Sequence, residues 1–207
     1  DSGDTDVIFL KGIGQKHQGL EIEGSMKLND MIRLDGAVSF GKWKFDGDAD
    51  GLYTEYAEDT PKQTSYTYTL DGLYVGDQPQ TAYVLGTTLT PMDGLRLQGI
   101  FKMYDKNYAD WSPDSRELSG DADRSQVWQA PAYNRLDLHA AYKLPKIAGY
   151  DMTLTGHLFN ALDAVYVQDA VDNSQYNGFG DKLHLAHNAE VFLGTPRYFN
   201  LGLTVNF

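Results

Sequence analysis

The last ten residues of the chain, Tyr198-Phe-Asn-Leu-Gly-Leu-Thr-Val-Asn-Phe207, alternate between apolar and polar side chains. A period of two residues is typical of a β-strand whose two faces meet different surroundings. A soluble β-sandwich could use such a strand. A transmembrane β-barrel would also use it, with apolar side chains on lipid and polar side chains toward a wet interior. The rest of the sequence has to decide between the two folds.

The same alternation recurs six more times upstream. The apolar phases cover residues 20–28, 32–40, 83–89, 95–103, 136–144 and 152–158. None of these apolar positions is charged, whereas the opposite phase carries both basic and acidic side chains: Lys27, Arg33, Arg96, Lys102, Arg135, Lys143, Glu21, Glu23, Asp35 and Asp137. Unpaired charges are too costly for the dry core of a sandwich, but they can face water inside a barrel. The pattern therefore predicts an all-β, transmembrane antiparallel β-barrel segment of about seven strands.

The connections between these segments alternate between short and long. Asn29-Asp30, Met92-Asp93 and Pro145–Tyr150 are tight, whereas residues 46–80, 107–132 and 166–190 form long connections. Outer-membrane barrels have short periplasmic turns and long extracellular loops. The order of connections places residues 1–17 outside the cell. Because the strand count is odd, we expect at least one further strand upstream.

The amino-acid composition excludes several classes of function. The chain has 207 residues, no cysteine and a formal net charge of −12. It offers no disulfide framework or cysteine-based zinc site, and its acidity argues against nucleic acid as a partner. No nucleophile–base or paired-carboxylate pattern stands out, so the sequence predicts neither an enzyme nor a bound cofactor.

Several runs of sequence resemble the late barrel of TonB-dependent outer-membrane receptors. These runs are Asp71–Pro79, Thr81–Pro91 with Asp93–Leu95, Tyr133–Leu138, His157–Asp163 with Tyr166, and Leu193–Arg197 before the terminal strand. Their order along the chain is similar to that in the family, and their character is similar to the Bacteroidetes branch. Asn160-Ala-Leu-Asp163 departs from the usual family motif at that place.

The resemblance implies a bacterial outer-membrane barrel of about 22 strands, an N-terminal plug and a TonB box. Residues 1–207 would be the C-terminal portion of that barrel, with the plug and TonB box outside this chain. The implied function is energy-coupled import of a scarce ligand: an iron chelate, cobalamin, a glycan or a peptide. The implied partners are TonB (through the plug), upstream strands of the same protein, outer-membrane lipids, the barrel-assembly machinery and, as a further candidate, a surface lipoprotein. The terminal strand, with Leu203, Val205 and Phe207, would carry the assembly signal. An alternative is a structural or adhesion barrel whose acidic loops bind partners.

Candidate ligand-binding residues lie in the long connections. Aromatic platforms with a nearby guanidinium can grip a sugar, chelate or macrocycle, and the residues of this type are Trp43, Tyr108, Trp111, Trp128 and Arg116. The alternative role for the aromatic residues is an outer aromatic belt at the membrane interface, or packing within the loops. His184 and His187, with Glu190, would converge on a ligand or metal if their loop formed a helical turn. The alternative is that they belong to an ordinary polar loop. Residues 46–51 imitate a calcium loop, but Ala57 stands where a bidentate carboxylate is required, so no metal site is predicted.

Overall fold

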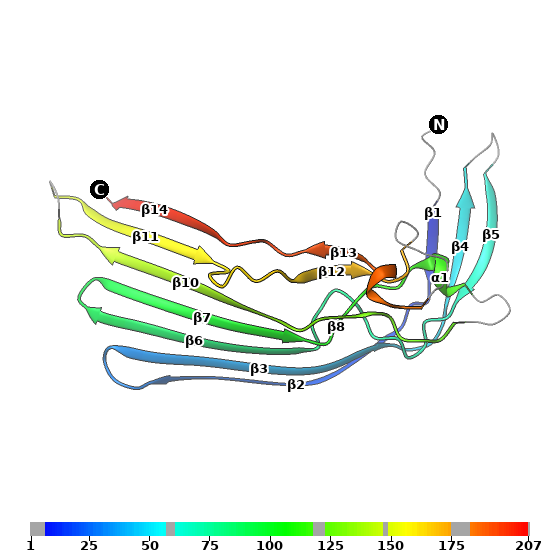
Figure 1. Cartoon of the computed structure of the whole chain (residues 1–207), viewed down its shortest axis with the longest axis horizontal. Helices are drawn as coiled ribbons and strands as arrows, with labels where there is room; N and C mark the ends of the chain where they lie inside the picture. Colours follow the sequence, from blue (N-terminus) through cyan, green and yellow to red (C-terminus); the bar gives the residue numbers. More distant parts are fainter. Residues whose placement is uncertain (1–6, 57–60, 118–122, 147–148, 175–182, 207) are drawn as a thin grey trace.

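A curved, seven-stranded antiparallel sheet dominates the computed structural model, which describes residues 7–56, 61–117, 123–146, 149–174 and 183–206. The strands lie side by side in the order β14-β11-β10-β7-β6-β3-β2 (Figure 1). Their bounds are β2 (Gln15–Lys27), β3 (Ile32–Phe45), β6 (Thr81–Met92), β7 (Leu95–Asp105), β10 (Tyr133–Lys143), β11 (Asp151–Phe159) and β14 (Tyr198–Asn206). All seven predicted strands are confirmed, and each pairs with its neighbours along the chain within this sheet.

The register of the sheet places the apolar residues of neighbouring strands on one face and the polar and charged residues on the other. Leu154 lies opposite Leu203, and Val38 lies opposite both Ile22 and Tyr83. Because facing residues in antiparallel strands project to the same side, the apolar phases form one continuous apolar face. Its side chains are exposed, as Leu203 shows with 58% of its surface accessible. The charged side chains form the opposite face, which we call the polar face.

Tight turns join the strands at one end of the sheet. In the β2–β3 turn, Asn29 Oδ1 accepts hydrogen bonds from the backbone N–H groups of Met31 (2.8 Å) and Ile32 (2.9 Å). The β6–β7 turn consists of Asp93-Gly94, one residue later than predicted. Its register shifts at Pro91, which has no N–H to continue the ladder, and Gly94 supplies the positive φ of 81° that the turn requires.

The strands differ from the predicted ones mainly at their ends. β2 starts at Gln15 and β3 continues to Phe45, both well beyond the strictly alternating segments. Strict alternation is needed only where one face meets lipid, so longer strands lose the pattern once they leave the bilayer. Leu28 and Leu144 fall just outside β2 and β10, and Phe207 lies outside the described residues.

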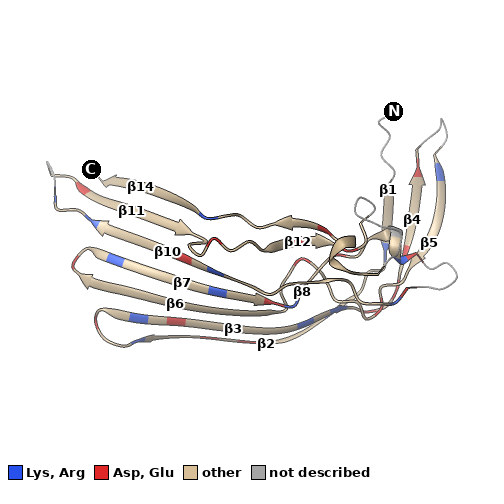
Figure 2. Cartoon of the chain, viewed as in Figure 1, with Lys and Arg blue, Asp and Glu red and all other residues tan. Residues whose placement is uncertain are grey.

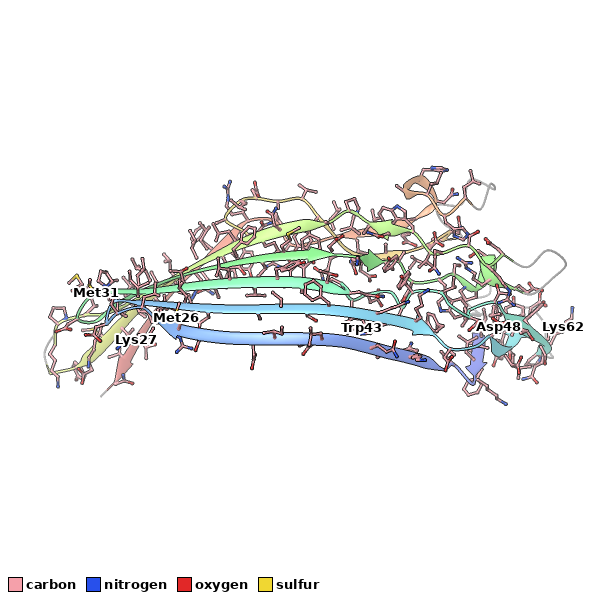
Figure 3. All side chains as sticks on the ribbon, turned by 90° about the horizontal axis from the view of Figure 1, so that it is seen from below. Met26, Lys27, Met31, Trp43, Asp48 and Lys62 are labelled. Carbon is pink, nitrogen blue, oxygen red and sulfur yellow. The ribbon has the colours of Figure 1, made fainter. Side chains whose placement is uncertain are left out.

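The long connections, together with the segment before β2, form a second region, which we call the cap. It contains β1 (Val7–Lys11), β4 (Ala49–Glu55), β5 (Lys62–Tyr68), β8 (Asn107–Tyr108), α1 (Pro113–Arg116), β9 (Gln129–Ala130), β12 (Val167–Val171), η1 (Ala186–Asn188) and β13 (Glu190–Leu193). The strands pair as β1-β4-β5, β8-β9 and β12-β13. Asp48 and Lys62 mark the cap end of the molecule, and Lys27 and Met31 mark the opposite, turn end (Figure 3). Residues predicted to be loops therefore carry regular structure.

The cap has an apolar core of its own. Its buried members are Phe45, Ala49, Tyr68, Leu70, Leu73 and Val127. Ile8 and Leu10 from β1 pack against this core, which places the chain's first described strand at the cap end, as expected for residues 1–17. No helix in the described part of the chain is long and apolar enough to cross a bilayer.

Candidate functional site in the cap and on the polar face

One buried asparagine joins three of the sequence runs at the end of β11. Asn160 is 1% exposed, and its backbone N–H donates to Asp137 Oδ1 (2.9 Å). Its side-chain Nδ2 donates to the carbonyl oxygens of Ala164 (2.9 Å) and Thr195 (3.2 Å), and its Oδ1 accepts from the Ala164 N–H (3.0 Å). These bonds tie together the interior of β10, the end of β11 and the segment leading into β14. The runs around residues 133–138, 157–163 and 193–197 therefore share a structural role.

Next to this junction, tyrosines form a row on the polar face. Tyr166 stacks on Tyr133 at a centroid distance of 4.4 Å, and Tyr104 lies 5.1 Å from Tyr133. Arg135 Nη1 donates to the Tyr166 hydroxyl (3.1 Å). Gly194 is required here, since a Cβ at this position would lie 1.9 Å from the Tyr166 ring. The row marks the level at which the sheet meets the cap.

Ion pairs occupy the polar face below the tyrosine row. Asp137, 2% exposed, receives a hydrogen bond from Lys102 Nζ (2.9 Å) and lies 3.6 Å from Arg135. Arg33 pairs with Asp35 at 2.7 Å. Figure 2 shows charged residues at intervals along the long strands. Such a face is compatible with water and incompatible with lipid.

Trp43 and Tyr108, two of the predicted ligand-binding residues, are held in place by neighbouring side chains. Trp43 stacks on His17 (5.6 Å), and Gln80 bonds to both its backbone N–H and its carbonyl oxygen (3.1 Å each). Trp43 lies toward the cap end of β3 (Figure 3). Tyr108 stacks on Tyr74 at 4.2 Å, and burial, with the neighbouring Tyr74, raises the Tyr108 pKa to about 12. Both rings are half-buried and presented rigidly.

The other two predicted aromatic residues are also half-buried. Trp111 packs on Tyr68 (5.6 Å) and so borders the apolar core of the cap, as Tyr108 does. The Trp128 carbonyl oxygen accepts the Ala109 N–H (2.8 Å), which fixes its backbone beside β8. Tyr108 and Trp111 therefore both pack against the apolar core of the cap, whereas Trp43 lies on β3 and is not part of that core.

Arg116, predicted to contact ligand, points inward. It is 0% exposed, and its Nη1 donates to the carbonyl oxygens of Ser125 (2.8 Å) and Asp123 (3.3 Å). Its Nη2 lies 3.5 Å from Asp172 Oδ2 and 3.3 Å from His184 Nδ1. Burial lowers the pKa of the Arg116 guanidinium, and the two aspartates oppose that shift. In this arrangement Arg116 links two long connections from inside the cap.

His184 lies between two carboxylates. Its Nδ1 contacts Asp172 and its Nε2 contacts Asp123. Burial opposes the charged imidazolium, but the hydrogen bonds to both aspartates prevail and raise the His184 pKa. Glu190 accepts a hydrogen bond from Ser174 Oγ (2.8 Å), whereas His184 contacts Arg116 and the two aspartates. A shared site of His184 and Glu190 with His187 stays a prediction. Across the described residues, no group of three or more His, Asp or Glu side chains could hold a metal ion.

In the acidic segment that imitates a calcium loop, Asp48 bonds to other parts of the protein. Asp48 Oδ1 accepts the backbone N–H groups of Leu70 and Asp71 (3.0 Å each). Arg124 bonds to both oxygens of Asp48 (3.1 and 2.8 Å), and this pairing lowers the Asp48 pKa to about 2. A carboxylate neutralised in this way is a poor calcium ligand. Ala57 lies outside the described residues.

Three further aspartates meet within the cap, an arrangement that the sequence did not predict. Asp77 interacts with Asp110 and Asp169. Burial raises the Asp110 pKa, and the hydrogen bond with Asp77 together with burial raises the Asp169 pKa. Gly76 must lack a side chain, since a Cβ would lie 2.5 Å from Asp110 Oδ1. This packing accounts for the Gly-Asp pair within the run 71–79.

The fold and its two faces define a class of protein: this sheet is part of the wall of a transmembrane β-barrel, with folded loops at one end. A family model described as TonB dependent receptor-like, beta-barrel, matches residues 2–161. The chain therefore belongs to that family, which is associated with transport across the bacterial outer membrane. No curated protein matches the chain.

The Asn160 junction is the main structural site that sequence reasoning did not resolve. Asn160 and Asp163 both adopt positive φ, at 49° and 53°. Asn and Asp tolerate this conformation better than most residues. The Asn-Ala-Leu-Asp spacing therefore carried a turn signal, but the partners of that turn, Asp137 and Thr195, lie far away in sequence.

Proposed function

We propose that this chain forms one sector of the wall of an energy-coupled outer-membrane importer, and that its cap is part of the surface that captures the ligand. The observation that carries the proposal is the uninterrupted pairing of an apolar face with a charged face across seven strands. The chain belongs to the TonB-dependent receptor-like barrel family, and this membership supports a function in transport.

Further strands of the same protein would close the barrel. Within the described residues, β2 and β14 each pair on one side only. Backbone N–H and C=O groups exposed to lipid must be paired, so both edges need neighbours. A barrel of about 22 strands would leave room for a plug, through which TonB would act. Leu203, Val205 and Phe207 would present the terminal strand to the barrel-assembly machinery.

The ligand would be an iron chelate, cobalamin, a glycan or a peptide, first met by the cap. Trp128 is half-buried and His187 is exposed, so both can contact a solute. Trp43, Tyr108 and Trp111 would offer the accessible parts of their fixed rings. Arg116 and His184 would support the surface from within. A Bacteroidetes-type importer with a surface lipoprotein over this cap is the narrower form of the proposal.

The first test is independent of the ligand. Full-length receptor should be retained by an immobilised periplasmic domain of TonB. Intact cells should then be tested for uptake of labelled ferric citrate, cobalamin, a maltodextrin and an oligoalanine peptide, with and without a protonophore. We expect uptake of one probe to require both the receptor and the proton gradient.

A paired variant addresses the role of the cap. The double substitution W128A/H187A should weaken surface binding of that probe about tenfold, as expected when contact residues are lost. Y150A changes an exposed aromatic residue at the turn end and should leave binding unchanged. Failure of the full-length receptor to bind TonB would contradict the importer and favour a structural or adhesion barrel.

A further inference from the structure

A hollow on the polar face lies between β7, β10 and β11, away from the cap. Its lining residues are Arg96, Gln98, His139, Ala140, Ala141, His157 and Phe159. Gln98, His139 and His157 occupy paired positions on three successive strands, so their side chains stand in one row across the wall. Arg96 precedes Gln98 by two residues and projects to the same face. The hollow is therefore a place where polar groups from three strands meet inside the barrel.

Positive charge in this hollow is not balanced. No carboxylate is among the lining residues, and the nearby Asp137 is already bound by Lys102 and by the Asn160 N–H (2.9 Å each). Within the described residues, Arg96 has no hydrogen-bond or ion-pair partner, whereas Arg33 on the same face is paired with Asp35 at 2.7 Å. Arg96 thus presents a free guanidinium to the interior.

The two histidines add hydrogen-bond donors. His139 Nδ1 and His157 Nδ1 lie 2.8 Å apart, so one donates and the other accepts. The ring that accepts at Nδ1 carries its proton on Nε2, so the neutral pair keeps one Nε2–H donor for a further partner. A metal cation is disfavoured here, because each Nδ1 is occupied by the other ring and Arg96 repels positive charge. Phe159 flanks both rings, at 5.4 and 5.9 Å, and limits access from one side.

We propose that this hollow binds an oxyanion, namely a carboxylate or phosphate group of a small solute inside the barrel. The planar fork of Arg96 matches two oxygens of such a group, and Gln98 and the imidazole pair supply further donors. The proposal goes beyond the importer function, since it concerns equilibrium binding on the barrel wall and does not require transport.

The test uses full-length receptor in detergent and isothermal titration with pyrophosphate and with citrate. Wild-type protein should bind at least one of these anions. R96Q should weaken binding about tenfold, the loss expected when one charge-assisted contact is removed. The double variant H139Q/H157Q, which retains neutral hydrogen-bonding side chains, should weaken binding to a smaller extent.

R33Q is the matched control, because it removes an arginine from the same face that is already neutralised by Asp35. Its affinity should stay within about twofold of wild type. The proposal is overturned if wild-type protein binds neither anion, if R96Q binds as well as wild type, or if R33Q loses as much affinity as R96Q. The proposal would also be overturned if wild-type protein bound no anion and R96Q were thermally less stable. That result would mean that Arg96 pairs with an acidic group of the protein itself, which then fills the hollow.

Discussion

Arginine at position 203 should destabilise the barrel far more than arginine at position 204. Leu203 lies on the apolar face opposite Leu154, one residue from the centre of the nine-residue strand β14. An arginine near the bilayer midplane on the lipid side costs about 2–4 kcal/mol. That cost corresponds to a loss of about 30-fold to 700-fold in the folding equilibrium constant. Thr204 lies on the polar face opposite Thr153, where arginine meets water and should cost about 0.5 kcal/mol or less.

The assay is urea titration of full-length receptor refolded into lipid vesicles, with the folded fraction read from heat-modifiable migration. L203R should shift the midpoint strongly to lower urea, and T204R should stay near wild type. Equal shifts for the two variants would refute the assignment of the two faces, because depth in the bilayer is almost the same for adjacent residues.

The cap and the junction allow two further predictions. N160A should cost about 1–3 kcal/mol, because it leaves backbone groups at Ala164 and Thr195 without their partner; urea titration should show this, while N134A, on an exposed residue of β10, should stay within about 0.5 kcal/mol. The raised pKa of His184 means that its stabilising contribution is complete below the ordinary value of about 6.5 and is lost as pH rises through the raised pKa. Limited proteolysis of the cap should therefore accelerate severalfold between about pH 6 and about pH 9, and a flat profile in wild type, or an equally steep one in H184Q, would contradict this.

The transmembrane part of the fold could be predicted from sequence because lipid imposes a simple rule. A strand that faces lipid on one side and water on the other must alternate between apolar and polar residues. The faces of Leu138 and His139 can therefore be assigned from the sequence without knowing which strand pairs with them. The same rule predicted the tight turns to within a residue. The shift at Asp93-Gly94 arose because Pro91 interrupts the ladder, which is a local backbone effect and not a matter of hydrophobic pattern.

The cap could not be predicted in the same way, because its order depends on contacts between distant residues, many of them polar. Arg116 meets Asp172 across 56 positions of sequence, and Arg124 meets Asp48 across 76. A lone arginine in a polar segment has no periodic signature, so its burial depends on partners that only the folded chain identifies. For that reason Arg116 was predicted at the ligand surface and is instead inside the cap.

The buried guanidinium of Arg116 has a mechanical consequence. It binds backbone at residues 123 and 125 and side chains at 172 and 184, while its own carbonyl oxygen accepts the Thr69 N–H (2.8 Å). All three long connections are thereby fastened to a single residue. A force applied to any one of them is shared by the other two, so this sector of the barrel mouth responds as a stiff unit and not as three independent flaps.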